Sequence, residues 1–212
     1  MDPKIIICGT GRAGTTLLVR ILTSAGMDTG FKPHRFKGVE ENLGKAGLEK
    51  VVKRHKVDQL PQVVKAPLIV DVLPQLLKEN WFEIGLAIIP IRDLAAAAAS
   101  RKQVHRRAIE AGEDPAMVPG GLWKTDAPDN QHWVLAEQFY RTLEPLVAAE
   151  VPVVTMSFPR FAEDVDYFDR TLGPVLETRF GVDRERLRAA HAKECNPALI
   201  TGEAAVTAEG GS

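Results

Sequence analysis

The sequence contains few cysteines, no long apolar run and no excess of charge of either sign. Cys8 and Cys195 are the two cysteines among 212 residues. Two thiols cannot form the disulfide framework of a small secreted domain, so we expect a reducing, cytoplasmic environment. No run of about 18 apolar residues occurs, and the short apolar run near the start is not typical of a secretory signal. We therefore expect no association with a membrane.

The charged residues balance almost completely. The chain has 27 Lys and Arg against 28 Asp and Glu, which leaves a net charge of −1. That balance argues against bulk electrostatic binding of nucleic acid. Hydrophobic residues make up 45% and charged residues 26% of the chain, as in ordinary globular proteins. We expect a single domain over residues 1–200, because no linker divides it, and a flexible, small and polar tail over 201–212.

Apolar, β-branched segments alternate along the chain with segments of helical spacing. This alternation predicts an α/β fold of three layers, with a central parallel β-sheet flanked by helices on both faces. Strands are expected at 4–8, 62–65, 84–91 and 151–156. Helices are expected at 15–25, 46–55, 72–77, 94–111, 133–147, 161–180 and 183–193.

Some side chains receive an interpretation from their local pattern alone. Asp71, Asp93 and Asp183 each stand where a carboxylate caps the N-terminus of the helix that follows. Trp133 recurs at helical spacing with other apolar residues, so it is expected in the core. A basic run is either a solvated helix face or a positive field that attracts an acidic ligand. Its residues are Arg101, Lys102, His105, Arg106 and Arg107.

A glycine-rich loop, Gly9 to Thr16, separates the first expected strand from the first expected helix. Gly9 and Gly14 have the spacing of the P-loop pattern G-x-x-x-x-G-K-[ST], but Thr15 occupies the lysine position. The backbone N–H groups and the helix N-terminus of such a loop bind an anion without that lysine. The absence of the lysine counts against hydrolysis of ATP or GTP. The alternative is a tight turn that binds nothing.

A second group of polar residues follows the third expected strand. Arg92 ends this strand, at the edge where open α/β sheets bind ligands. Ser100 comes eight residues later, just over two helical turns, so it shares a helix face with the region after Arg92. An arginine fork and a hydroxyl that converge on one group suit a phosphate. The alternative is an ion pair between Arg92 and Asp93 and a serine with no binding role.

Together the two motifs resemble the family of sulfotransferases that use 3′-phosphoadenosine 5′-phosphosulfate (PAPS). Arg12-Ala13-Gly14-Thr15-Thr16 is similar to the family's [RK]-x-G-[ST]-[ST] loop, and the residues and spacing of Arg92 and Ser100 match its second motif. The resemblance implies a P-loop-like fold. It assigns Arg92 and Ser100 to the 3′-phosphate. It assigns the 5′-phosphosulfate to residues of the loop, which are Gly11, Arg12, Ala13, Gly14, Thr15 and Thr16.

The resemblance covers residues 9–25 and 85–101 approximately. It implies an enzyme that transfers a sulfuryl group from PAPS to a hydroxyl or amine of a small-molecule or saccharide acceptor. Arg12 would stabilise the leaving phosphate and Lys65 would approach the sulfonate. Pro67 stands where some members have a histidine base, so the expected base is Glu41, with Glu40 beside it. Lys193 to Pro197 does not match the basic, glycine-containing loop that covers the nucleotide in many members.

No metal is expected, because the five histidines lack ligand spacing. His34 and Asp71 are weaker candidates for the base. Trp123 lies in a glycine- and proline-rich segment, where an aromatic ring suits stacking on a sugar or ring acceptor.

Two other functions stay open at this point. A divergent P-loop kinase or hydrolase would bind ATP in a magnesium-dependent way. A nucleotide-binding protein without catalysis would bind 3′,5′-adenosine bisphosphate tightly but would turn over no acceptor. The oligomeric state is not indicated by the sequence.

Overall fold

The computed structural model describes residues 2–33, 36, 47–114, 118 and 120–195. His34, Glu40, Glu41 and the tail 201–212 lie outside these residues. Within them, no helix combines the length and the apolar character that crossing a bilayer requires.

Four parallel strands form the central sheet. They are β1 (Lys4–Ile7), β2 (Val63–Lys65), β3 (Ile84–Ile91) and β4 (Val153–Ser157), in the order β2-β1-β3-β4. All four expected strands are therefore confirmed. Every residue of β1 is buried, as expected for an interior strand of a parallel sheet that is covered on both faces.

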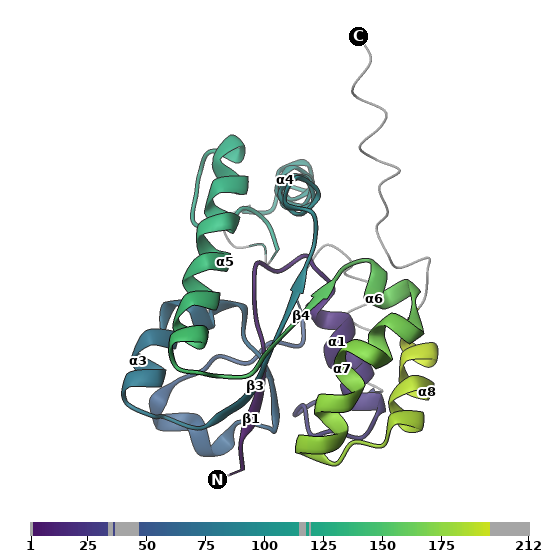
Figure 1. Cartoon of the computed structure of the whole chain (residues 1–212). Helices are drawn as coiled ribbons and strands as arrows, with labels where there is room; N and C mark the ends of the chain where they lie inside the picture. Colours follow the sequence, from purple (N-terminus) through teal and green to yellow (C-terminus); the bar gives the residue numbers. More distant parts are fainter. Residues whose placement is uncertain (1, 34–35, 37–46, 115–117, 119, 196–212) are drawn as a thin grey trace.

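Helices cover both faces of this sheet, which confirms a three-layer α/β fold (Figure 1). They are α1 (Thr15–Ser24), α3 (Leu73–Lys78), α4 (Leu94–Glu110), α5 (Gln131–Ala148), α6 (Arg160–Glu163), α7 (Val165–Phe180) and α8 (Arg184–Glu194), with short 3₁₀ helices η2 (Arg54–Gln59), η3 (Pro67–Asp71) and η5 (Pro128–Asn130). Ile5 and Ile7 pack in the apolar core on the side of α1, α7 and α8, whereas Ile6 packs in the core on the side of α3. This alternation follows from the period of two in a strand.

Two of the expected helices differ from the structure. Over the described part of 46–55, the chain is irregular up to residue 53, and η2 then begins at Arg54. The N–H of Lys50 donates to the carbonyl of Lys65, so this segment runs beside the end of β2 instead of coiling. The helix expected at 161–180 is divided at Asp164, whose extended backbone ends α6 and whose side chain caps α7 by accepting from the N–H of Tyr167.

The local interpretations of single side chains had mixed outcomes. The carboxylates of Asp93 and Asp183 cap α4 and α8 as expected. Asp71 does not cap α3, because it ends η3 and its carboxylate forms an ion pair with Lys124. Trp133 is 69% exposed, so its placement in the core was wrong.

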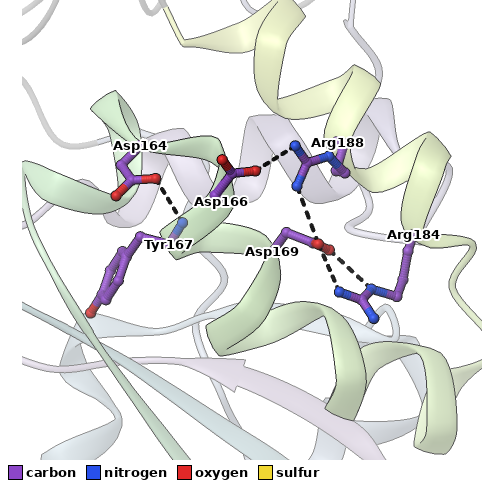
Figure 2. A network of polar contacts seen from close by, with 6 residues as sticks. All are labelled: Asp164, Asp166, Tyr167, Asp169, Arg184 and Arg188. Atoms are coloured by element: carbon purple, nitrogen blue, oxygen red, sulfur yellow. Dashed lines mark hydrogen bonds and ion pairs between the residues drawn. The ribbon is translucent and has the colours of Figure 1, made fainter.

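An ion-pair network joins α7 to α8 (Figure 2). The buried carboxylate of Asp169 accepts from Arg184 at 2.7 and 3.1 Å and from Arg188 at 3.2 Å. Arg188 also donates to Asp166 at 2.6 Å. The hydrogen bonds from Arg184 are the main cause that holds the pKa of Asp169 below its usual value. The network therefore links α8, the last helix of the described chain, to α7.

Replacing Asp169 with asparagine is expected to lower the melting temperature at pH 7, because two guanidinium groups lose their shared carboxylate. The pKa of Asp169 is lower in the folded state, so its stabilisation is present above the ordinary aspartate pKa of 3.8 and is lost as the pH falls through the folded value. The gap between D169N and the parent protein should therefore narrow below about pH 4. Thermal unfolding followed by circular dichroism across pH measures both effects.

The matched control is Asp166→Asn, which removes a single contact to Arg188 from an exposed carboxylate. Exposed ion pairs contribute little, so D166N should melt close to the parent protein. A D169N protein that melts with the parent at pH 7, or a gap that does not change with pH, would contradict the role given to Asp169.

Candidate functional site

The loop between β1 and α1 has an unusual backbone. Gly9, Gly11, Arg12 and Gly14 all have positive φ, at 110°, 67°, 56° and 78°. Left-handed residues interspersed in a turn make successive N–H groups face inward, and the N-terminus of α1 adds its positive end. Gly14 is the N-cap of α1 and has no side chain to cap it. The loop therefore suits an anionic group at the start of α1.

Neighbouring side chains leave no room for larger residues at two of the glycines. A Cβ atom on Gly14 would lie 2.6 Å from the ring of Phe158 and 2.7 Å from that of Phe161. A Cβ atom on Gly11 would lie 2.8 Å from Nη2 of Arg101. Phe158 directly succeeds β4, Phe161 lies on α6 and Arg101 lies on α4, so distant parts of the chain fix the shape of the loop.

The structure brings Arg12, Arg92 and Ser100 together, as the two sequence motifs together require. Arg12 Nε donates to Ser100 Oγ at 3.0 Å across 88 residues of sequence. Arg92 Nη1 donates to the carbonyl of Arg12 at 3.3 Å, and its guanidinium lies 5.6 Å from the ring centre of Phe158. Arg92 follows β3 and Ser100 lies on α4, so the carboxyl edge of the sheet holds the whole group.

Positive charge accumulates around this loop. Burial is the largest cause that lowers the pKa of Arg12, and the positive charges of Arg92 and Arg107 lower it further. Arg107 lies on α4 seven residues after Ser100, about two turns along the same face. Like charges this close raise each other's free energy, and an anion bound between them would relieve it. The electrostatics of the loop therefore favour a ligand that carries negative charge.

Arg101, on α4, supports the backbone of the loop. Its side chain is 3% exposed, and it donates to the carbonyls of Thr10 at 2.7 Å and of Gly121 at 2.8 Å. Its guanidinium lies 4.9 Å from the ring centre of Trp123. Burial is the main cause that lowers the pKa of Arg101, to about 10. Of the two alternatives for the basic run, the solvated face does not hold for Arg101, while Arg106 and Arg107 are exposed.

Lys65 reaches the same loop from the end of β2. Its side chain is almost fully buried, and Nζ donates to Thr16 Oγ1 at 2.9 Å and to the carbonyl of Gly47 at 2.5 Å. The carboxylate of Glu49 lies 3.2 Å from the same nitrogen. Burial lowers the pKa of Lys65, and Glu49 partly opposes this by favouring the charged form. The lysine is therefore a buried cation in contact with the first turn of α1.

Glu49 and Gln138 were not anticipated from the sequence. Glu49 is partly exposed and contacts Lys65 because its segment runs beside the end of β2. The amide of Gln138, on α5, donates to the carbonyl of Gly9 at 3.2 Å and to that of Pro67 at 3.4 Å. Both contacts depend on tertiary packing, and no motif or periodicity marks either residue.

Glu41, the expected base, is not among the described residues.

In the described ranges, no three or more His, Cys, Asp or Glu side chains group so as to hold a metal ion. A scan against protein-family models and a search of curated proteins found no match to this sequence. The function is therefore argued from the site itself.

Proposed function

We propose that the protein transfers a sulfuryl group from PAPS to a hydroxyl or amine of a small acceptor. The observation that carries this proposal is the contact between Arg12 and Ser100, which joins the anion-binding loop to the arginine and serine after β3. A donor with phosphate at both its 5′ and 3′ positions needs these two sets of groups side by side. The P-loop-like form of the fold is part of the same proposal.

Each set has a distinct role. The N–H groups at the start of α1, with Arg12 and Lys65, hold the 5′-phosphosulfate. Arg92 and Ser100 hold the 3′-phosphate, and Arg107 adds positive potential from the exposed side. Burial lowers the pKa of Arg12 most, and the charges of Arg92 and Arg107 lower it further. A multiply charged nucleotide would offset the repulsion from these two charges, which supports this assignment.

The reaction balances without a further reactant. A bond forms between the acceptor oxygen or nitrogen and sulfur while the bond from sulfur to the 5′-phosphate oxygen breaks. The electron pair of the broken bond stays on the phosphate, which leaves 3′,5′-adenosine bisphosphate. Negative charge grows on that oxygen in the transition state, so Arg12 and Lys65 stabilise the transition state more than the ground state.

The acceptor proton needs a base within hydrogen-bond reach. Glu49 is the described carboxylate that lies next to Lys65, 3.2 Å from its nitrogen. We therefore assign the proton to Glu49, and Glu41 keeps its place as the candidate that the sequence resemblance implies.

Calorimetric titration tests the nucleotide specificity that this function requires. The protein is titrated with 3′,5′-adenosine bisphosphate in the absence of magnesium and, in parallel, with ATP and magnesium. Micromolar binding of the bisphosphate alone is expected. Binding of ATP alone would overturn the proposal and favour a kinase or hydrolase.

Replacing Arg92 or Ser100 with alanine should weaken binding of 3′,5′-adenosine bisphosphate more than binding of AMP, which lacks the 3′-phosphate. A lost charge-assisted hydrogen bond typically costs about 1.5–3 kcal/mol, or roughly 10- to 150-fold in affinity. Arg106→Ala is the control, because Arg106 is an exposed arginine on the same helix. Equal losses for the two nucleotides would remove the assignment to the 3′-phosphate.

A further inference from the structure

Arg101 is a buried cation whose hydrogen bonds go to backbone carbonyls. Its side chain is 3% exposed, and no carboxylate of the described residues lies within ion-pair distance of its guanidinium. Burial lowers its pKa to about 10, so the guanidinium remains charged at neutral pH. A buried charge without an opposite charge beside it is costly. An anion bound in the adjacent loop would offset this cost, because it would act as the counter-ion.

The hydrogen bond from Arg101 to the carbonyl of Thr10 orients one peptide group of the loop. The peptide bond between Thr10 and Gly11 is trans. The C=O and the N–H of a trans peptide lie in one plane and point in opposite directions. Because Arg101 Nη2 holds the carbonyl of Thr10 at 2.7 Å, the N–H of Gly11 points away from the guanidinium. Arg101 therefore sets the direction in which one loop N–H donates.

Two other side chains hold neighbouring carbonyls of the loop in the same way. Gln138 Nε2 donates to the carbonyl of Gly9, and Arg92 Nη1 donates to that of Arg12. By the same geometry, the N–H group that follows each carbonyl points away from its donor. Three side chains thus set the directions of three N–H groups, and Arg101 is the most deeply buried of the three.

Trp123 holds the guanidinium of Arg101 in place. The guanidinium carbon lies 4.9 Å from the centre of the Trp123 ring. A cation stacked on an indole is stabilised most where water is excluded. The backbone of Trp123 is itself fixed by the buried Gln131, which accepts from its N–H at 2.6 Å and donates to its carbonyl at 3.4 Å. The first residue of α5 therefore fixes Trp123, and Trp123 fixes the arginine that orients the loop.

We propose that Trp123 is a positioning residue of the nucleotide site, which acts through Arg101 on the direction of the loop N–H groups. From the sequence alone, the indole of Trp123 suited stacking on an acceptor. Its contact with a guanidinium of the protein assigns it to the donor side of the site instead. The identity of the nucleotide rests on the proposed function, whereas the positioning role requires only that the loop binds an anion.

This role predicts an equal loss for every nucleotide that places its 5′ group in the loop. Trp123→Leu should weaken AMP and 3′,5′-adenosine bisphosphate by the same factor, about 5- to 30-fold, as expected for a lost cation–π contact. Trp123→Phe keeps an aromatic face and should lose less. Arg101→Lys should lose at least as much as W123L, because an ammonium group lacks the planar fork that spans two carbonyls. Arg92→Ala, in contrast, should weaken the bisphosphate more than AMP.

Calorimetry with AMP, the bisphosphate, ATP and inorganic pyrophosphate measures these losses well below the melting temperature of each variant. Trp81→Leu is the matched control, because Trp81 is a partly buried tryptophan that packs in the core on the side of α3. W81L should bind as the parent does. The double variant W123L/R101K should bind like R101K alone, because both substitutions act through one guanidinium, whereas the losses of W123L and R92A should multiply. Should W123L not fold, Trp123→Phe is compared with Trp81→Phe.

The outcomes separate this proposal from the proposed function. Unchanged binding in the Trp123 variants, an equal loss in W81L, or losses of W123L and R101K that multiply would overturn the positioning role alone. Binding of ATP or AMP but not of the bisphosphate, with the expected loss in W123L, would overturn the proposed function and leave the positioning role in place. A parent protein that binds none of the four anions would overturn both.

Discussion

Replacing Lys65 with methionine is expected to lower kcat for sulfuryl transfer about 100- to 1000-fold, the usual effect of losing one preorganised charge-stabilising donor. Binding of 3′,5′-adenosine bisphosphate should change little, because Arg12, Arg92 and Ser100 still hold its phosphates. Lys65 Nζ lies 2.9 Å from Thr16 Oγ1 in the first turn of α1, where charge develops in the proposed reaction. Initial rates and calorimetry separate the two effects.

The pH dependence of the proposed sulfuryl transfer by the parent protein tests the same role of Lys65. Burial lowers the pKa of Lys65, so the charged form is lost at a lower pH than for an ordinary lysine. Because the proposed role needs the charged form, kcat should fall on the alkaline side below the ordinary lysine pKa of 10.5. This alkaline fall should be absent from the residual activity of K65M.

Lys4→Met is the matched control for K65M. Lys4 is a second buried strand lysine, 9% exposed, and its Nζ donates to the carbonyl of Leu60 at 3.0 Å. It starts β1, whereas Lys65 ends β2 at the opposite edge of the sheet. K4M should keep kcat. A similar loss in both variants would mean that any buried lysine produces it, and an unchanged kcat in K65M would refute the role assigned to Lys65.

Replacing Gly14 with alanine should abolish measurable nucleotide binding and also destabilise the fold. Its φ of 78° costs an L residue about 1–2 kcal/mol. The added Cβ would meet the rings of Phe158 and Phe161 at 2.6 and 2.7 Å, and overpacking of this kind typically costs about 1–3 kcal/mol more. Denaturant unfolding and calorimetry measure the two consequences.

Gly112→Ala separates the two contributions to the lost stability, which are the strained backbone conformation and the steric clash of the added Cβ atom. Gly112 also has a positive φ, 70°, but a Cβ atom there would meet nothing within 4 Å. G112A should therefore lose the smaller, conformational part of the stability and keep nucleotide binding. If G14A bound the nucleotide as the parent does, the packing of the loop against Phe158 and Phe161 would not matter for the site.

The parts of the site that follow from local pattern could be predicted from the sequence. The four strands are short apolar runs, and their alternation with helical segments places the loop, Arg92 and Lys65 at the same edge of the sheet. Parallel strands bring their carboxyl ends together, so the spacing between Arg92 and Ser100 was enough to locate both residues near the loop. Arg12 and Ser100 then meet at 3.0 Å.

The supports of the site could not be predicted, because they depend on packing between distant segments. Gln138 lies on the buried side of an amphipathic helix, and its sequence neighbours do not reveal that it reaches Gly9. Arg101 belongs to a basic run, so only its 3% exposure distinguishes it from the exposed arginines that follow it. Trp133 shares its helical repeat with Tyr140 and Val147, which are exposed, whereas the buried repeat of α5 includes the polar residues Gln131, Gln138 and Thr142. Apolar spacing alone therefore selected the wrong face of this helix.

The long sequence separations within this small site have a consequence for biosynthesis. Arg12 meets Ser100 across 88 residues, and Gly9 meets Gln138 across 129. A ribosome adds about 5–20 residues per second, so several seconds pass between emergence of the loop and emergence of the residues that hold it. A nascent chain that ends before α5 lacks the amide that supports Gly9. Under the proposed function, we therefore expect a chain that ends before α5 to bind the donor nucleotide more weakly than the complete chain does.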